Sequence, residues 1–110
     1  MTDQRPAGLT IIQQQLNELD RLAGQTLQDL NTVAGTERVA QWKARTVALL
    51  TQAVGQAEGQ RFAGVHPGPS FTNDMFEEFA ELVECYRTSL SALAKRLDDG
   101  LLIPPPEAGA

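Results

Sequence analysis

DMFEEFAELVECYRTSLSALAKRLDDG, residues 74–100, is the stretch whose pattern decides the fold. Its large apolar residues recur at alternating spacings of three and four, which lines side chains along one face of an α-helix. They are Phe76, Phe79, Val83, Tyr86, Leu90, Leu93 and Leu97. Candidate N-caps lie at 72–74, Asp74 with Glu77 has the form of a capping box, and Gly100 favours a stop. The pattern predicts a helix about 35–40 Å long at about 1.5 Å per residue.

A second amphipathic pattern covers residues 9–31. Its stripe consists of Leu9, Ile12, Leu16, Leu19, Ala23, Thr26 and Leu30, widened by Leu22 and Leu27. Thr10 followed by Gln13 resembles a capping box, so we expect the helix to begin there. Residues 31–36, NTVAGT, are short, polar and contain glycine, which is typical of a connection between antiparallel neighbours.

Another helix, the second in chain order, is predicted from Thr36, as N-cap, to Val54. Gly55 would adopt a left-handed conformation at its end. Its apolar stripe covers about half the helical circumference, so we expect it to be contacted from two sides. Trp42 lies on this face. Lys43 also falls inside it and would have to extend its ammonium group to water.

Residues 55–72 contain four glycines and two prolines, and we expect no regular element there. Phe62 and Phe71 would anchor this long loop. The domain organisation expected is a flexible N-terminus over 1–8, a bundle over 9–100 and a Pro-rich tail over 101–110. The predicted fold is an all-α, antiparallel three-helix bundle with a long irregular loop between its second and third helices.

Composition excludes several classes of protein. The chain has 110 residues, 42% hydrophobic and 5% aromatic, which suits one small domain with an aliphatic core. A net charge of −5 disfavours nucleic acid and anionic lipid as partners. The absence of a long apolar run or a secretion-like start predicts a cytoplasmic protein with no membrane association. One cysteine, Cys85, excludes an internal disulfide.

An acidic cluster on the predicted last helix has three interpretations. Asp74, Glu77, Glu78, Glu81 and Glu84 fall opposite its apolar stripe. Carboxylates at helical spacing can bind metal, but no Glu-x-x-His pair accompanies these and the stripe turns them outward, so we expect no metal. A solvated face favoured by the helix dipole explains them, and a docking surface for a basic partner is the functional alternative.

A basic and aromatic group surrounds Trp42. It consists of Arg38, Lys43, Arg45 and Arg61 together with the indole. Such residues can stack on bases or hold phosphates, but no Gly-rich phosphate loop is present. The structural interpretation is that Trp42 fills the core or an interface, while the basic residues balance acidic neighbours on the last helix.

No catalytic residue and no cofactor site emerges from the sequence. His66, the single histidine, lies between Val65 and Pro67 with nothing to orient it as an acid or base. Cys85 falls on the outer side of its helix beside Glu84, which disfavours a thiolate. We therefore expect a protein that is not an enzyme.

The residues Gln41-Trp42-Lys43-Ala44-Arg45-Thr46-Val47-Ala48-Leu49-Leu50, Val54-Gly55 and Gln60-Arg61-Phe62 support a family comparison. With the late amphipathic helix they resemble a bacterial helical module that has a W-K-x-R-T-x-x-L-L segment, an F-G pair and a loop phenylalanine. This module often precedes another domain, including TIR-like nucleotide-binding domains of proposed conflict or anti-phage systems. The similarity covers residues 9–100, with Val54 in place of the usual phenylalanine and no domain expected after the prolines. It implies a helical accessory or interaction role and transfers no nucleotide chemistry.

The predicted function is a non-catalytic protein-interaction or self-association module, an accessory protein of a bacterial stress or defence system. Its partner would be another protein or a second copy in a homodimer. The expected interface residues are Arg38, Trp42, Arg45, Arg61, Phe62, Glu77, Glu81 and Glu84. The alternative is a small ligand- or nucleic-acid-binding regulator that uses Trp42, Arg45 and Arg61.

Overall fold

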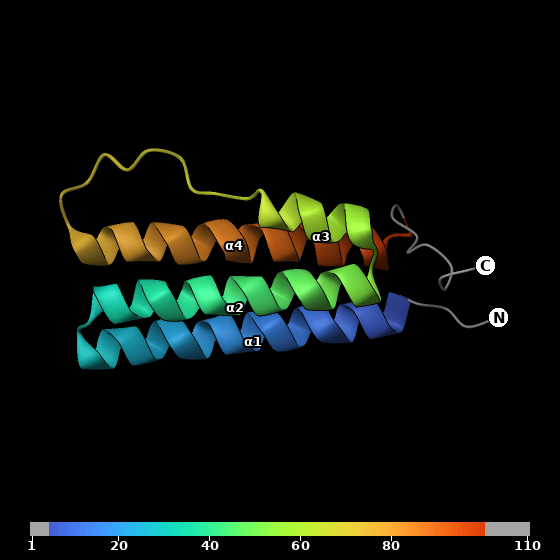
Figure 1. The fold of residues 1–110 in the computed structure, drawn as a ribbon, viewed down its shortest axis with the longest axis horizontal. Helices are drawn as coiled ribbons and strands as arrows, with labels where there is room; N and C mark the ends of the chain where they lie inside the picture. The colour runs from blue at the N-terminus through green and yellow to red at the C-terminus, as the bar shows by residue number, and fades with distance from the viewer. Residues whose placement is uncertain (1–4, 101–110) are drawn as a thin grey trace.

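The computed structural model describes residues 5–100, which form four α-helices packed together (Figure 1). They are α1 (Arg5–Asp29), α2 (Thr32–Ala53), α3 (Gln56–Ala63) and α4 (Met75–Asp98). The prediction of an all-α fold is confirmed, since residues 5–100 contain no strand. The number of helices differs from the prediction, because α3 lies inside the segment expected to be an irregular loop. Figure 1 shows α1 running opposite to α2 and α4, with α3 beside them.

The helix α1 begins at Arg5, ahead of the start expected at Thr10. Pro6 lies in the first turn, where its missing N–H costs no hydrogen bond. The Thr10 hydroxyl donates to the carbonyl oxygen of Pro6 at 2.9 Å, so it acts inside the helix and not as a cap. Gln13 donates forward to Asn17 at 3.0 Å, and the expected capping box is absent. Part of the region 1–8 that was expected to be flexible is therefore helical.

The turn between α1 and α2 is shorter than expected. Leu30 adopts a left-handed conformation with φ 56°, which ends α1. Asn31 then caps α2, its side-chain oxygen accepting from the backbone N–H of Ala34 at 3.0 Å. Thr36, the expected cap, and Gly35 lie inside α2. Gly35 is buried against Thr26 of α1, so it serves helix packing and not the turn.

The helix α3 contradicts the prediction that residues 55–72 hold no regular element. Gly55 has φ 141° and lets the chain turn directly from α2 into α3. A Cβ at Gly59 would overlap the Thr51 hydroxyl, so this glycine allows α3 to pack closely on α2. Phe62 is buried and anchors the segment, whereas Phe71, the second expected anchor, is 96% exposed.

The helix α4 follows its prediction closely. Asp74 is the N-cap, accepting from the backbone N–H groups of Phe76 and Glu77. The helix ends at Asp98, and Gly100 has φ 74° just beyond it. Its apolar stripe is buried from Phe79 to Leu97, while Phe76 at the first turn stays 40% exposed. The expected tail over 101–110 lies outside the described residues.

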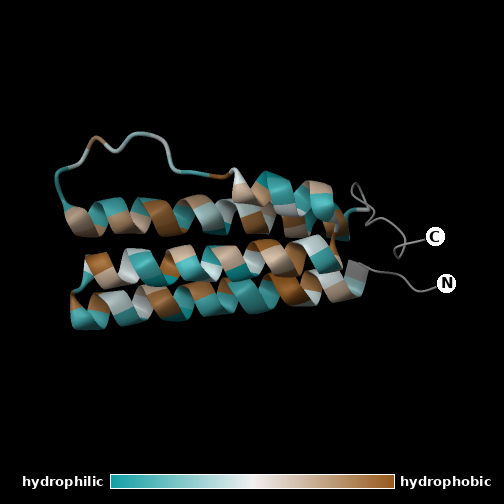
Figure 2. Cartoon of the chain, in the orientation of Figure 1, coloured by the Kyte–Doolittle hydropathy of each residue, from teal (hydrophilic) through white to brown (hydrophobic). Residues whose placement is uncertain are grey.

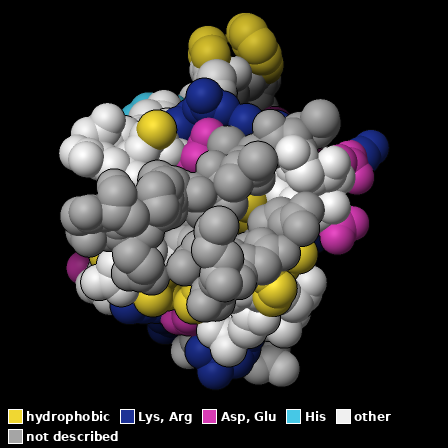
Figure 3. All heavy atoms as spheres, turned by 90° about the vertical axis from the view of Figure 1, so that its right-hand side faces the viewer, with side chains coloured by type: hydrophobic (Ala, Val, Ile, Leu, Met, Phe, Trp, Pro, Cys, Tyr) yellow, Lys and Arg dark blue, Asp and Glu magenta, His cyan; other side chains and the backbone are white. Residues whose placement is uncertain are grey.

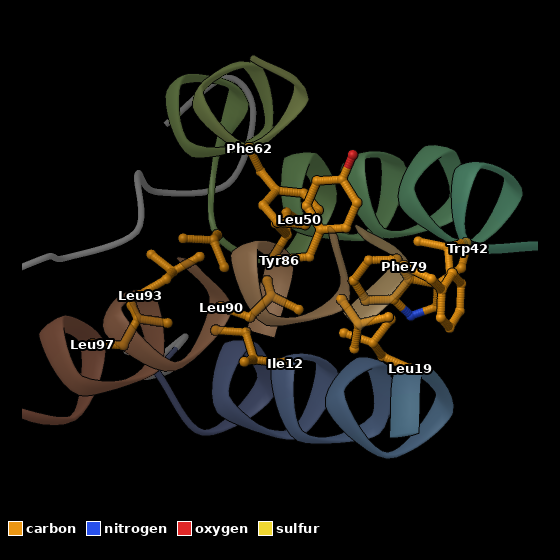
Figure 4. Packing of buried hydrophobic residues seen from close by; sticks show 13 residues of the cluster. Ile12, Leu19, Trp42, Leu50, Phe62, Phe79, Tyr86, Leu90, Leu93 and Leu97 are labelled. Atoms are coloured by element: carbon orange, nitrogen blue, oxygen red, sulfur yellow. The ribbon is translucent and has the colours of Figure 1, made fainter. Parts of the chain in front are cut away.

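One hydrophobic core joins the four helices. Hydrophobic residues alternate with polar ones along each long helix (Figure 2). The buried cluster comprises Ile12, Leu19, Val39, Trp42, Leu50, Val54, Phe62, Phe79, Val83, Tyr86, Leu90, Leu93 and Leu97. Figure 4 shows this packing, with Phe62 reaching from α3 toward Tyr86 of α4.

A buried polar network connects α1 to α2 inside this core. The Trp42 indole N–H donates to the carbonyl oxygen of Gln15 at 2.9 Å. The Gln15 amide donates to the Thr46 hydroxyl at 2.7 Å, which donates to the carbonyl oxygen of Trp42 at 2.8 Å. Each of these buried groups therefore has a partner, which avoids the cost of an unpaired polar group in the core.

Candidate functional site

The two aromatic residues of the predicted interface lie in the core. Trp42 is 0% exposed and Phe62 is 4% exposed. Their ring centroids are 6.0 Å apart in an edge-to-face arrangement, and the Phe62 and Tyr86 centroids are 5.7 Å apart. Such aromatic packing contributes to stability. Neither side chain is available to a partner, because the broad apolar face of α2 packs against α1 and α3.

The three arginines of the predicted interface form ion pairs within the chain. Arg38 contacts Asp29 at 3.0 Å and Arg45 contacts Glu18, so both tie α2 to α1. The hydrogen bond from Arg38 lowers the pKa of Asp29. The expectation that these residues balance acidic groups on the last helix was wrong, because the flank of α2 that carries them faces α1.

Arg61 belongs to a separate ion-pair group centred on Glu58, a residue that the sequence interpretation missed. Glu58 is 6% exposed and lies 3.3 Å from both Arg61 and Arg96. A buried carboxylate needs such pairing to offset its lost hydration. The group connects α3 to α4. The sequence feature that could have indicated this ion pair is a glutamate three residues before an arginine, since residues at this spacing meet on one face of a helix.

Lys43 attaches the segment after α3 to α2. Its ammonium group donates to the carbonyl oxygen of Val65 at 2.6 Å and lies 4.9 Å from the centroid of the Tyr86 ring. Burial lowers the pKa of Lys43 and raises the pKa of Tyr86. Lys43 is half-buried, and the chain after α3 supplies a carbonyl partner for its ammonium group that the sequence analysis did not predict.

The glutamates of the predicted interface lie on the exposed side of α4. Glu77 accepts from the Thr72 hydroxyl at 2.6 Å, and Glu81 accepts from the Ser70 hydroxyl at 3.1 Å. Glu84 lies 3.3 Å from Arg87 one turn along the helix. Within residues 5–100, no group of three or more His, Cys, Asp or Glu side chains could hold a metal ion.

The candidate binding surface is an apolar end of the molecule. All six large hydrophobic side chains exposed in the described part of the chain fall in residues 27–33 or 71–76. They are Leu27, Leu30, Val33, Phe71, Met75 and Phe76, which we call the apolar end. Figure 1 shows that α1 ends, α2 begins and α4 begins at this side of the bundle, which brings the two segments together. Helical periodicity could not reveal the surface, because Leu27, Leu30 and Phe76 continue stripes that are buried elsewhere along their helices, whereas Val33, Phe71 and Met75 belong to no predicted stripe.

A groove adjoins the apolar end. It has a volume of about 450 Å³ and lies between the first turns of α2, the first two turns of α4 and the chain at 67–70. Val33 and Met75 line it and also belong to the apolar end. The groove and the apolar end therefore share these two side chains.

His66 and Cys85 line a second hollow, with Glu81 also in its wall. His66 is exposed and Cys85 is half-buried. This hollow brings together residues that the sequence analysis treated as unrelated. Among residues 5–100, no side chain or backbone group forms a hydrogen bond with the imidazole.

Comparisons with protein-family models, with curated proteins and with solved structures give no match. The resemblance to the bacterial helical module therefore stays a prediction. Within the described residues, none of the helices has the length and apolar character needed to cross a membrane.

Proposed function

We propose that this chain is a non-catalytic helical module that binds a protein, either a partner or a second copy of itself, through the apolar end. The observation that carries the proposal is the gathering of the exposed large hydrophobic residues at one side of the bundle. Val33 and Leu30 are each 70% exposed and Met75 is 57% exposed. Contiguous exposed apolar surface on a small domain marks an interaction site.

The charges next to the apolar end favour a basic partner. Glu77, Glu78 and Glu81 are exposed near the start of α4. Complementary charge steers association and selects a partner, while two acidic surfaces repel each other. A partner that carries lysines or arginines beside an apolar face matches this surface.

The alternative, a small ligand- or nucleic-acid-binding regulator, has less support. Its central residue Trp42 is fully buried. Arg45 pairs with Glu18 and Arg61 pairs with Glu58, so each guanidinium already has a carboxylate partner. The accessory role in a bacterial stress or defence system rests on the resemblance of residues 9–100 alone, and the cytoplasmic location is a prediction from composition.

Light scattering across a concentration series separates self-association from binding to another protein. If copies associate through the apolar end, the mean mass rises with concentration, and Val33→Lys lowers it. Ala44→Lys is the matched control, because Ala44 is also exposed on α2 but lies about 16 Å further along at about 1.5 Å per residue. A constant monomer mass would remove self-association and leave another protein as the partner.

A further inference from the structure

The face between α2 and α4 is only partly covered by α3. α3 has eight residues and α4 has 24, so their lengths are about 12 Å and about 36 Å. Near its end, α3 packs Phe62 on Tyr86, and Lys43 of α2 holds the carbonyl oxygen of Val65. Residues 75–85 of α4, about 16 Å or three turns, therefore lie beyond the end of α3 and are not covered by it.

The segment 64–74 crosses this uncovered stretch without filling it. Residues 66–71 are all exposed, and Phe71 is 96% exposed. The segment is attached to α4 by hydrogen bonds from Ser70 to Glu81 and from Thr72 to Glu77. Figure 3 shows hydrophobic side chains standing out from the body on the side where Figure 1 draws this segment. The groove described above lies beneath it.

The chemistry of the groove is apolar with an acidic rim. Val33, Met75, Phe79 and Leu82 supply its apolar wall. Glu78 and Glu81 supply the rim, and no lysine, arginine or histidine belongs to the described lining. Both carboxylates are on exposed residues, and within residues 5–100 the Ser70 hydroxyl is the one hydrogen-bond donor to Glu81.

We infer that this groove binds one amphipathic helix of a partner protein, with lysines or arginines flanking its apolar face. The inference rests on the proposed function and identifies the partner's chemistry. A groove between two helices accepts a helix, whose apolar side chains at successive turns enter it. About three turns of helix fit the uncovered length of α4.

A second copy of the chain fits the groove poorly. It carries the same acidic rim, and many of its cations are already engaged in ion pairs. Within the described residues, the paired arginines are Arg38, Arg45, Arg61, Arg87 and Arg96. A different protein with free basic side chains is the better occupant.

Nuclear magnetic resonance titration with two synthetic peptides tests this inference. Each peptide has about 14 residues with leucine on one helical face, and the flanking positions carry lysine in one and glutamate in the other. We expect the lysine peptide to bind in about 150 mM salt and to shift the backbone signals of Val33, Thr36 and Leu82. We expect the glutamate peptide to bind at least about tenfold more weakly.

Two protein variants that change the net charge equally distinguish the effect of the rim carboxylates on peptide binding from the effect of the net charge. Glu78→Gln with Glu81→Gln is expected to weaken the lysine peptide about fivefold, since each exposed pair contributes modestly. Ala44→Lys with Ala48→Lys adds the same charge at exposed positions of α2 outside the groove, and its effect should be under about twofold.

Any of four results would overturn the inference. They are a lysine peptide that shows no saturable binding, signal shifts that map outside the groove, equal binding of both peptides, and equal effects of the two variants. A second experiment, photo-crosslinking in cells from a photoreactive amino acid at position 33, tests the proposed function separately. If this position crosslinks to a protein while the peptide fails to bind, the groove assignment is wrong and the proposed function stands. If both experiments fail, the proposed function is wrong as well.

Discussion

Replacing Gly35 by alanine tests the close approach between α1 and α2. A Cβ at this position would overlap the Thr26 hydroxyl and lie 2.5 Å from its methyl carbon. Both heavy atoms face the glycine, so every staggered rotamer of Thr26 leaves at least one of them there. Thr26 is fully buried and its hydroxyl donates to the carbonyl oxygen of Leu22 at 2.9 Å. The helices must therefore move apart to admit the methyl group.

The expected cost follows from two opposing effects. Overpacking a core costs about 1–3 kcal/mol, while replacing glycine by alanine inside a helix gains about 0.5–1 kcal/mol. Because two atoms would lie within 2.5 Å of the added Cβ, the cost falls in the upper part of the overpacking range, and we expect Gly35→Ala to lower the free energy of unfolding by about 1–2 kcal/mol. In a domain of this size each kcal/mol shifts Tm by about 4–8 °C, so the loss is visible in a thermal melt followed by circular dichroism.

Two further variants show whether Thr26 is the cause. Thr26→Ala removes the two clashing atoms but keeps a Cβ 3.0 Å from the added one, so adding Gly35→Ala in that background should cost at least about 1 kcal/mol less than in the wild type. Gly24→Ala is the matched control, because nothing lies within 4 Å of its Cβ, and it should stabilise by about 0.5–1 kcal/mol. A Gly35→Ala protein as stable as the wild type, or the same loss with and without Thr26, would refute the predicted packing.

The remaining predictions concern strain, the polar network and pH. Leu30→Gly should raise the free energy of unfolding by about 1 kcal/mol, because Leu30 has φ 56°; an unchanged urea midpoint would contradict this. Trp42→Phe removes the indole N–H that donates to the carbonyl oxygen of Gln15 and leaves a cavity in the core, so urea unfolding should show a loss of about 1–3 kcal/mol, and a neutral effect would contradict the network. Burial raises the pKa of Tyr86 above 10.0, so the folded state holds the proton more tightly than the unfolded state. Stability should fall as the pH rises through that raised pKa, and Tyr86→Phe should remove this fall; identical pH profiles of the two proteins would refute it.

The sequence predicted the long helices because their packing stripes are periodic. The stripe from Phe79 to Leu97 is regular enough to mark α4 and its N-cap Asp74. The short helix α3 could not be predicted, because Gly59 serves a close contact with Thr51 that exists only in the folded chain. From the local sequence alone, such a glycine disfavours a helix.

The candidate site was less predictable than the fold. Periodicity placed Trp42 on an apolar face, but it cannot tell a core from an interface, and the indole lies in the core. Conversely, Val33 and Met75 are exposed because α1 ends and both α2 and α4 begin beside them. This exposure depends on the relative positions of helices that are far apart in the sequence. Glu77 and Glu81 accept hydrogen bonds from Thr72 and Ser70, and their role in an interface stays a prediction.

Photo-crosslinking in cells that produce the chain naturally tests most directly whether the apolar end binds protein. A photoreactive amino acid replaces Val33 in one protein and Ala44, exposed on the same helix, in another. We predict a discrete adduct from position 33, with a second copy or with another protein, that Met75→Lys weakens, and no such adduct from position 44. Equal adduct patterns from both positions, or no adduct from position 33, would contradict the account.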